Sequence, residues 1–115
     1  MSERPASSAL APWAGLFLGA AGWFAHHQIA SSLIDWDCTL GGPLLTLGLG
    51  LVCGLVIAAG GLISWRVHRR LAAAPQDAPH NRNVSGMIGA GAAAVFLLAV
   101  VFQALSGVIV PACHR

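Results

Sequence analysis

Charge is what this sequence has least of. Only 9% of its 115 residues are charged and 57% are hydrophobic, whereas a soluble globular domain carries about a quarter charged residues. No Asp, Glu, Lys or Arg occurs in three long apolar blocks, residues 13–34, 43–65 and 85–110. Each block passes the length of about 20 mostly apolar residues that a spanning helix needs. The low share of charged residues excludes a soluble domain. Together with the three apolar blocks it predicts an all-α integral membrane protein, a single-domain bundle of three helices.

Catalytic and nucleotide-binding motifs are also missing. The sequence has no phosphate-binding loop, no nucleophile elbow and no zinc signature. No carboxylate lies inside an apolar block, which argues against a proton-coupled transporter. Asp35 and Asp37 are close in sequence, but they lie in a short loop with no nearby general base. We therefore expect a protein that is not an enzyme and that binds no nucleic acid.

A cleaved signal peptide is the alternative interpretation of the first block. Its basic start would be weak, because Glu3 cancels Arg4. Its apolar region would contain Trp23 and the polar residues 26–28, and it would run past the usual length of about 7 to 15 residues. We therefore interpret residues 13–34 as a true membrane span.

The arginines orient the three spans. The connection 66–84 holds four arginines against one acid, whereas the connection 35–42 holds two aspartates and no base. Positive residues near span ends stay in the cytoplasm. We therefore expect 66–84 to be a cytoplasmic loop and 35–42 a periplasmic loop of a multi-pass bacterial inner-membrane protein. The N-terminal tail, 1–12, is then cytoplasmic and the C-terminal tail, 111–115, periplasmic. Three arginines leaving the second span are expected to contact anionic lipid headgroups: Arg66, Arg69 and Arg70.

This topology places two cysteines on the same side of the membrane. Cys38 lies four residues beyond the first span and Cys113 three residues beyond the third. The periplasm permits disulfides, and packed helices can bring their ends within the ~6 Å between Cα atoms that a disulfide needs. We expect a Cys38–Cys113 disulfide, the alternative being two unrelated free thiols. Cys53, within the second span, is expected to be a small packing residue.

Small residues predict close helix packing. Gly15, Gly19, Gly22 and His26 follow one another at steps of four, three and four, so they share one stripe of the first helix. Gly15 and Gly19 form a GxxxG pattern, which lets helix backbones approach closely, and the second span contains another. The packing could be internal or against partner subunits.

The polar triplet His26-His27-Gln28 interrupts the first span. Lipid tolerates such residues only where something shields them. His26 lies about eight residues, or roughly 12 Å, inside the outer end of its span, and Gln103 lies at a similar depth in the third span. One interpretation is therefore that the triplet forms hydrogen bonds to Gln103, to nearby serines and to backbone carbonyls.

Two other interpretations of the triplet stay open. Neighbouring helical residues point about 100° apart, so His26 and His27 cannot easily bind one metal together. No other span supplies a facing histidine, and a two-histidine haem site would therefore need an oligomer. Alternatively, the triplet contacts another membrane protein.

Four short motifs carry a resemblance that spans most of the chain. They are Trp23-x-x-His26, Cys38 twelve residues after that histidine, the exit Trp65-Arg66-x-x-Arg69, and Gln103 followed by Pro111-Ala112-Cys113. With them the chain resembles small uncharacterised bacterial "transmembrane prediction" proteins encoded beside haem–copper cytochrome c oxidase operons. It differs from them in having no tyrosine and in doubling the histidine.

The resemblance implies an accessory or assembly role near a respiratory oxidase. We therefore expect a non-catalytic accessory subunit or assembly factor without a cofactor of its own. Its partners would be membrane lipids and a larger membrane complex, with a homo-oligomer possible. One alternative is a redox protein that binds haem or copper through His26 or His27 in an oligomer. Another is a small homo-oligomeric channel or transporter.

Overall fold

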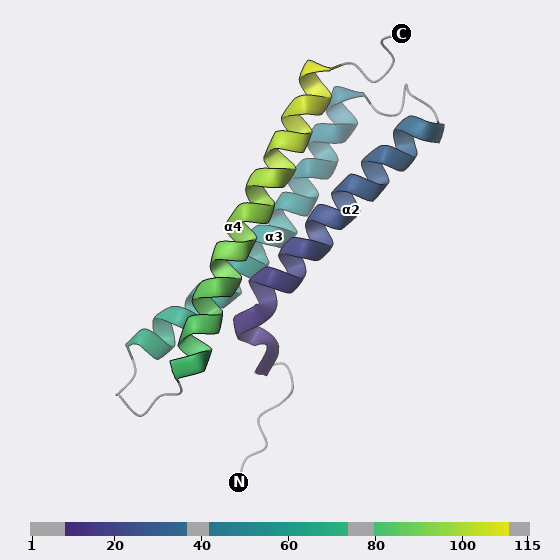
Figure 1. Ribbon diagram of the computed structural model, residues 1–115. Coiled ribbons are helices and arrows are strands. Elements are labelled where there is room, and N and C mark those ends of the chain that lie inside the picture. Colours follow the sequence, from purple (N-terminus) through teal and green to yellow (C-terminus); the bar gives the residue numbers. More distant parts are fainter. Residues whose placement is uncertain (1–8, 37–41, 74–79, 111–115) are drawn as a thin grey trace.

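Three long helices run side by side along one axis (Figure 1). The computed structural model describes residues 9–36, 42–73 and 80–110, and all its regular structure there is helical. In chain order the elements are η1 (Ala11–Trp13), α2 (Ala14–Trp36), α3 (Pro43–Ala72) and α4 (His80–Ile109). The molecule measures 62 × 24 × 16 Å, so the expected all-α three-helix arrangement is confirmed.

Prolines and arginines mark the ends of the helices. Pro43 lies in the first turn of α3, after an extended Gly42, where its missing N–H needs no partner. Pro12 has the same place in η1. At the other end of α3, Arg69 and Arg70 lie in the last turn, where positive charge favours the helix dipole.

The helices extend further than the predicted spans. α3 continues past residue 65 to Ala72, and α4 begins at His80. Much of the segment expected as a cytoplasmic loop, residues 66–84, is therefore helical. In the same way α2 continues to Trp36, into the expected outer loop.

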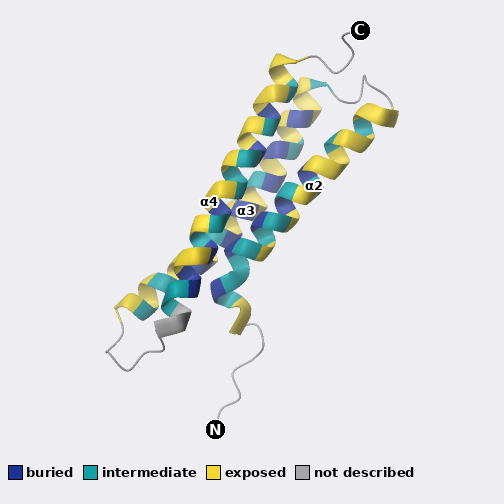
Figure 2. Ribbon diagram, in the orientation of Figure 1, coloured by how far each residue is buried: buried dark blue, intermediate teal, exposed yellow. Residues whose placement is uncertain are grey.

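Two of the three helices are long and apolar enough to cross a membrane. These are α3 and residues 83–109 of α4. The helix α2 is not among them, because its apolar run is broken by the polar triplet and by two serines. Most of the large apolar residues are exposed, and exposed residues follow all three helices (Figure 2). Such a surface suits lipid better than water and indicates a membrane protein.

The glycine stripe predicted on α2 is its buried face. Gly15, Gly19, Gly22 and His26 are the buried residues of α2. A Cβ added to Gly22 would lie 2.6 Å from Ile57 Cγ1 of α3, far inside contact distance. The stripe therefore brings the backbone of α2 directly against its neighbours, as small residues do in membrane bundles.

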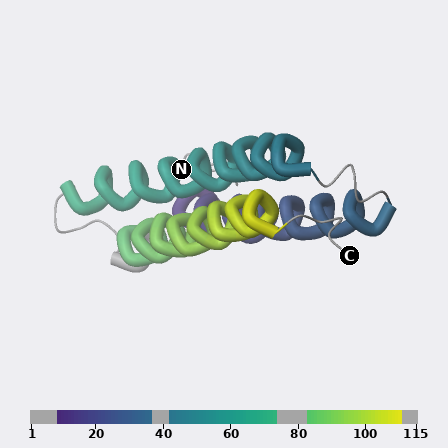
Figure 3. The backbone as a smooth tube through the Cα atoms, turned by 90° about the horizontal axis from the view of Figure 1, so that it is seen from above, coloured from purple at the N-terminus to yellow at the C-terminus, as the bar shows by residue number. Residues whose placement is uncertain are grey.

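The contact between α3 and α4 is more extensive than the contact of α2 with either of them. Seen from above, α3 and α4 run alongside each other (Figure 3). The fully buried core consists of Ile57 from α3 with Ala93 and Val100 from α4. Trp23 and Phe96 pack against it from its edge. The core therefore lies midway along the bundle, and α2 closes it.

Ser64 of α3 fastens the start of α2. Its side chain is completely buried. Its hydroxyl donates to the carbonyl oxygen of Pro12 at 2.9 Å and accepts the backbone N–H of Gly15 at 2.8 Å. The N–H groups of a helix's first turn have no partner within the helix. Ser64 thus supplies from a neighbouring helix the cap that α2 lacks in its own sequence.

Replacing Ser64 by alanine should destabilise the bundle. The change leaves a buried N–H and a buried carbonyl without this partner, which costs about 1–3 kcal/mol. Unfolding of the purified protein in mixed detergent micelles measures the loss. Ser106→Ala is the control, because the exposed Ser106 bonds only to its own helix, at the carbonyl of Gln103; its effect should stay within about 0.5 kcal/mol. Equal effects of the two changes would contradict the assigned role of Ser64.

Gly22→Val should weaken helix packing far more than Gly48→Val. The added side chain at position 22 would overlap Ile57, whereas a Cβ at Gly48 meets nothing within 4 Å. Forcing bulk into a packed contact costs about 1–3 kcal/mol or more. The same unfolding assay compares the two variants, which carry identical side chains on neighbouring helices. A Gly22→Val protein as stable as Gly48→Val would show that α2 does not pack as described.

Candidate functional site

The three residues of the polar triplet have three different environments. His26 is 1% exposed, at the end of the buried stripe of α2. His27 and Gln28 are both exposed. Because successive helical residues point about 100° apart, burying His26 turns Gln28 to the opposite side of α2. The triplet is therefore not one site: His26 is buried, His27 is exposed next to it, and Gln28 faces outward on the opposite side of α2.

Gln103 of α4 bridges the two histidines. Nδ1 of His26 donates to Oε1 of Gln103 at 3.1 Å, and Nε2 of Gln103 donates to Nδ1 of His27 at 3.3 Å. The amide offers one acceptor and one donor group, so the two rings carry opposite tautomers. His26 is protonated on Nδ1 and His27 on Nε2. The hydrogen bond between His26 and Gln103 that their matched depth predicts is present.

Trp23 stacks on the second histidine. The two rings are 5.8 Å apart and nearly parallel, at 7°. The other side of the contact is Phe96 of α4, whose ring centre lies 6.2 Å from that of Trp23. Trp23 and His27 are four residues apart and so lie on one face of α2. The tryptophan therefore holds the His27 ring in place beside Gln103.

Among the described residues, no hydrogen bond joins the triplet to the nearby serines, which are Ser31, Ser32 and Ser106. Ser106 donates to the carbonyl oxygen of Gln103 in its own helix, at 2.8 Å. Ser31 lines the same cavity as the two histidines, and no hydrogen bond joins it to them among the described residues. Among the described residues, the hydrogen bonds between the two rings and α4 are those of Gln103.

Trp23, His26, His27 and Gln103 form a polar cluster between α2 and α4. One buried nitrogen of this cluster has no hydrogen-bond partner among the described residues. Nε2 of His26 is buried without a hydrogen bond among the described residues. A Cβ added to Gly50 of α3 would lie 3.6 Å from this nitrogen and 3.1 Å from Cβ of Ala104. The nitrogen therefore lies beside the backbone of α3 at Gly50, which has no side chain to bind it.

A partly open cavity of about 520 Å³ lies beside the cluster. Its volume falls in the range of about 300–1,000 Å³ typical of small-molecule sites. Its polar lining comes from all three helices: His26, His27, Ser31, Thr46, Gln103 and Ser106. Within the described residues, no three His, Cys, Asp or Glu side chains come together as a metal site would require.

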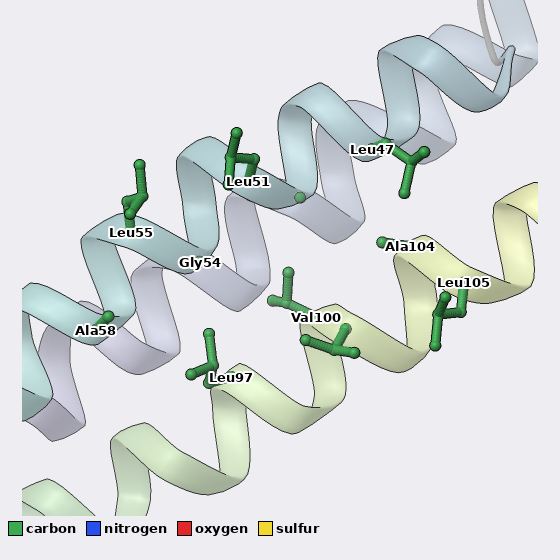
Figure 4. A pocket seen from close by; sticks show the side chains of 11 residues that line it. Leu47, Leu51, Gly54, Leu55, Ala58, Leu97, Val100, Ala104 and Leu105 are labelled. Atoms are coloured by element: carbon green, nitrogen blue, oxygen red, sulfur yellow. The ribbon is translucent and has the colours of Figure 1, made fainter.

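On the outer surface, an apolar groove runs along the line where α3 and α4 meet (Figure 4). Its volume is about 400 Å³, and its lining is almost entirely hydrocarbon. Gly54 and Ala58 form a shallow stretch between the side chains of Leu51, Leu55 and Leu97. This surface belongs to the same outward-facing apolar exterior as the rest of α3 and α4.

The three candidate lipid-binding arginines lie on the last two turns of α3. Arg66, Arg69 and Arg70 are all exposed, and their spacing of three and four residues gathers them on one side of the helix. Beside them, Nδ1 of His68 donates to the backbone carbonyl oxygen of Asn83 at 3.1 Å. This bond fixes the end of α3 against the start of α4.

Two predicted site residues, Cys38 and Cys113, lie outside the described residues. The expected disulfide between them therefore stays a prediction. Cys53 is a buried free thiol among its neighbours on α3, in agreement with its expected packing role. Ser64 was not anticipated, because nothing near it in the sequence indicates a partner 52 residues away.

None of the protein families, curated proteins or solved structures compared with the chain matches it.

Gln103→Leu should uncouple α2 from α4. The leucine removes the partner of Nδ1 on both histidines, and hydrogen bonds between membrane helices contribute about 0.6–2 kcal/mol. A double-mutant cycle with His26→Leu in the micelle unfolding assay should give a coupling energy of that size. The ¹⁵N shifts of the His26 ring should also show Nδ1 protonated in the parent protein, and a mixture of tautomers in Gln103→Leu. Additive effects of the two substitutions would refute the bond.

Proposed function

We propose that the chain is a three-span protein of the bacterial inner membrane. The N-terminus is cytoplasmic and the C-terminus periplasmic. The apolar exteriors of α3 and α4 support insertion, and the exposed arginines at the end of α3 support a cytoplasmic position for that end. α2 is the remaining span, because it packs alongside α3 and α4 and its histidines form hydrogen bonds inside the bundle.

We propose further that it is a non-catalytic accessory subunit or assembly factor of a respiratory membrane complex, the haem–copper oxidase. The observation that carries this proposal is the bridge His26–Gln103–His27. The side chains best suited to chemistry inside the membrane bind one another and hold two helices together. Such use favours a structural role over a reaction centre.

Three residues from the motifs behind the oxidase resemblance lie close together. Trp23, His26 and Gln103 all belong to the polar cluster, although they come from two helices. Trp65 and Arg66 lie together at the other end of α3, where the Trp65 and His68 rings are 5.2 Å apart. The contact between Trp23, His27, His26 and Gln103 supports the resemblance at these positions.

A second candidate function is a haem- or copper-binding redox protein. The unpartnered Nε2 of His26 favours it, because a neutral imidazole nitrogen is a common metal ligand. A chain contributes one free ring nitrogen in this arrangement, so a two-histidine site would join two copies.

Affinity purification from native membranes in a mild detergent tests the proposed function. We expect the oxidase subunits to co-purify with the tagged chain, as identified by mass spectrometry. A strain lacking the chain should assemble less oxidase, measured by reduced-minus-oxidised haem spectra of its membranes. The purified protein itself should show no Soret band and no stoichiometric copper.

Each measurement has an outcome that overturns one proposal. Normal oxidase assembly and turnover in the deletion strain would end the accessory role. A Soret band or bound copper that disappears in His26→Leu would favour the redox protein instead. The matched control is His68→Leu, since His68 lies at the opposite end of α3 from the cluster.

A further inference from the structure

The side chain of Gln28 faces outward from the middle of a membrane helix without a partner. It is exposed, and it makes no hydrogen bond to any described residue. It lies six residues before the end of the predicted span 13–34, which is about 9 Å of helix and farther than a glutamine side chain reaches. A carboxamide left bare in hydrocarbon is unfavourable, so a polar group outside the described fold must cover it.

The surface around Gln28 is a continuous stripe. The exposed residues of α2 opposite the buried glycines follow at steps of four, three, four and four: Phe17, Ala21, Phe24, Gln28 and Ser32. We call these five residues the outer stripe of α2. A hollow of about 280 Å³ opens beside its polar half, between Gln28, Ser32 and Trp36. α2 therefore has a second face with the spacing of a helix–helix contact.

We propose that the outer stripe binds the outer stripe of a second copy of this chain, with the two Gln28 carboxamides paired. This inference rests on the proposed membrane insertion. All copies insert with one topology, so a two-fold axis along the membrane normal brings the same residue of each copy together at the same depth. A carboxamide carries both a donor and an acceptor and so complements itself. The pair forms two reciprocal hydrogen bonds, each from Nε2 of one copy to Oε1 of the other.

A second copy fits this surface better than a lipid does. Acyl chains offer no donor or acceptor at the depth of Gln28. The residues flanking Gln28 on the stripe are a ring at Phe24 and a small hydroxyl at Ser32, which leave the carboxamide accessible to a facing helix. Across the bundle the exposed faces of α3 and α4 carry apolar side chains, so they give a second copy no comparable polar anchor.

Photo-crosslinking in intact membranes tests the pairing. Phe24, 58% exposed and one turn from Gln28, is replaced by the photoreactive residue p-benzoylphenylalanine, which leaves the carboxamide in place. We expect a product of twice the chain mass, 11.8 kDa. The matched control carries the same probe at Phe102, 67% exposed on α4, and should give no such product.

Gln28→Leu in the Phe24 probe chain should weaken the dimer about three- to thirty-fold, because both hydrogen bonds are lost. Gln28→Asn, which keeps a carboxamide, should retain part of the product. Both substitutions lie on the exposed surface, and equal accumulation in membranes checks that the bundle still forms.

Three results would overturn the proposal. They are no product from Phe24, a product containing a different protein, and a homodimer unaffected by Gln28→Leu. Oxidase co-purification and photo-crosslinking are both measured on the strain that carries the Phe24 probe with Gln28 intact. Retained co-purification with no dimer rejects only the pairing, whereas a dimer without co-purification rejects only the accessory role.

Discussion

The direct approach of the α2 backbone to α3 and α4 is the constraint on which the rest of this structure depends. Gly15, Gly19 and Gly22 place no side chain of α2 between the helices, and the Ser64 hydroxyl fixes the start of α2 in that position. Once the stripe is buried, helical geometry decides the next residue: position 26 must also point inward. A histidine is thus placed in the interior, and the bundle has to provide it with a hydrogen-bond partner.

Gln103 provides only part of the hydrogen bonds that the polar triplet needs, so its three residues end in different environments. A single amide supplies one acceptor and one donor group, enough for one nitrogen on each histidine ring. Nε2 of His26 stays unpartnered among the described residues, where it is buried beside Gly50 of α3, a residue with no side chain to bind it. Gln28, turned away by the same geometry, is left for the exterior. Its unmet hydrogen bonds are a consequence of the glycine stripe on the other side of the helix.

Sequence reasoning reaches the parts of this arrangement that helical periodicity and depth determine. The step between glycines predicts the buried stripe, and the fixed rise per residue places His26 level with Gln103. It does not reach Ser64, whose bond to Pro12 depends on how α2 tilts against α3 at a distance of 52 residues. It also mistakes the serines for partners of the triplet, since Ser106 bonds within its own helix instead. The sequence pattern also ends the second helix too early, at Trp65, because arginines end an apolar span although they do not end a helix.

The same hydrogen bonds limit what the histidines can do with a metal. Nε2 of His26 has a free lone pair but is buried beside Gly50. His27 is open to the exterior, but the bond from Gln103 keeps its proton on Nε2, the nitrogen that faces away from the bridge. Turning the amide over would free that nitrogen and reverse the tautomer of His26 with it. Within one chain the bridge therefore allows an accessible metal ligand only after it rearranges, and two free Nε2 atoms only when Gln103 releases the ring of His27. A cluster built in this way is better suited to holding α2 against α4 than to exchanging electrons.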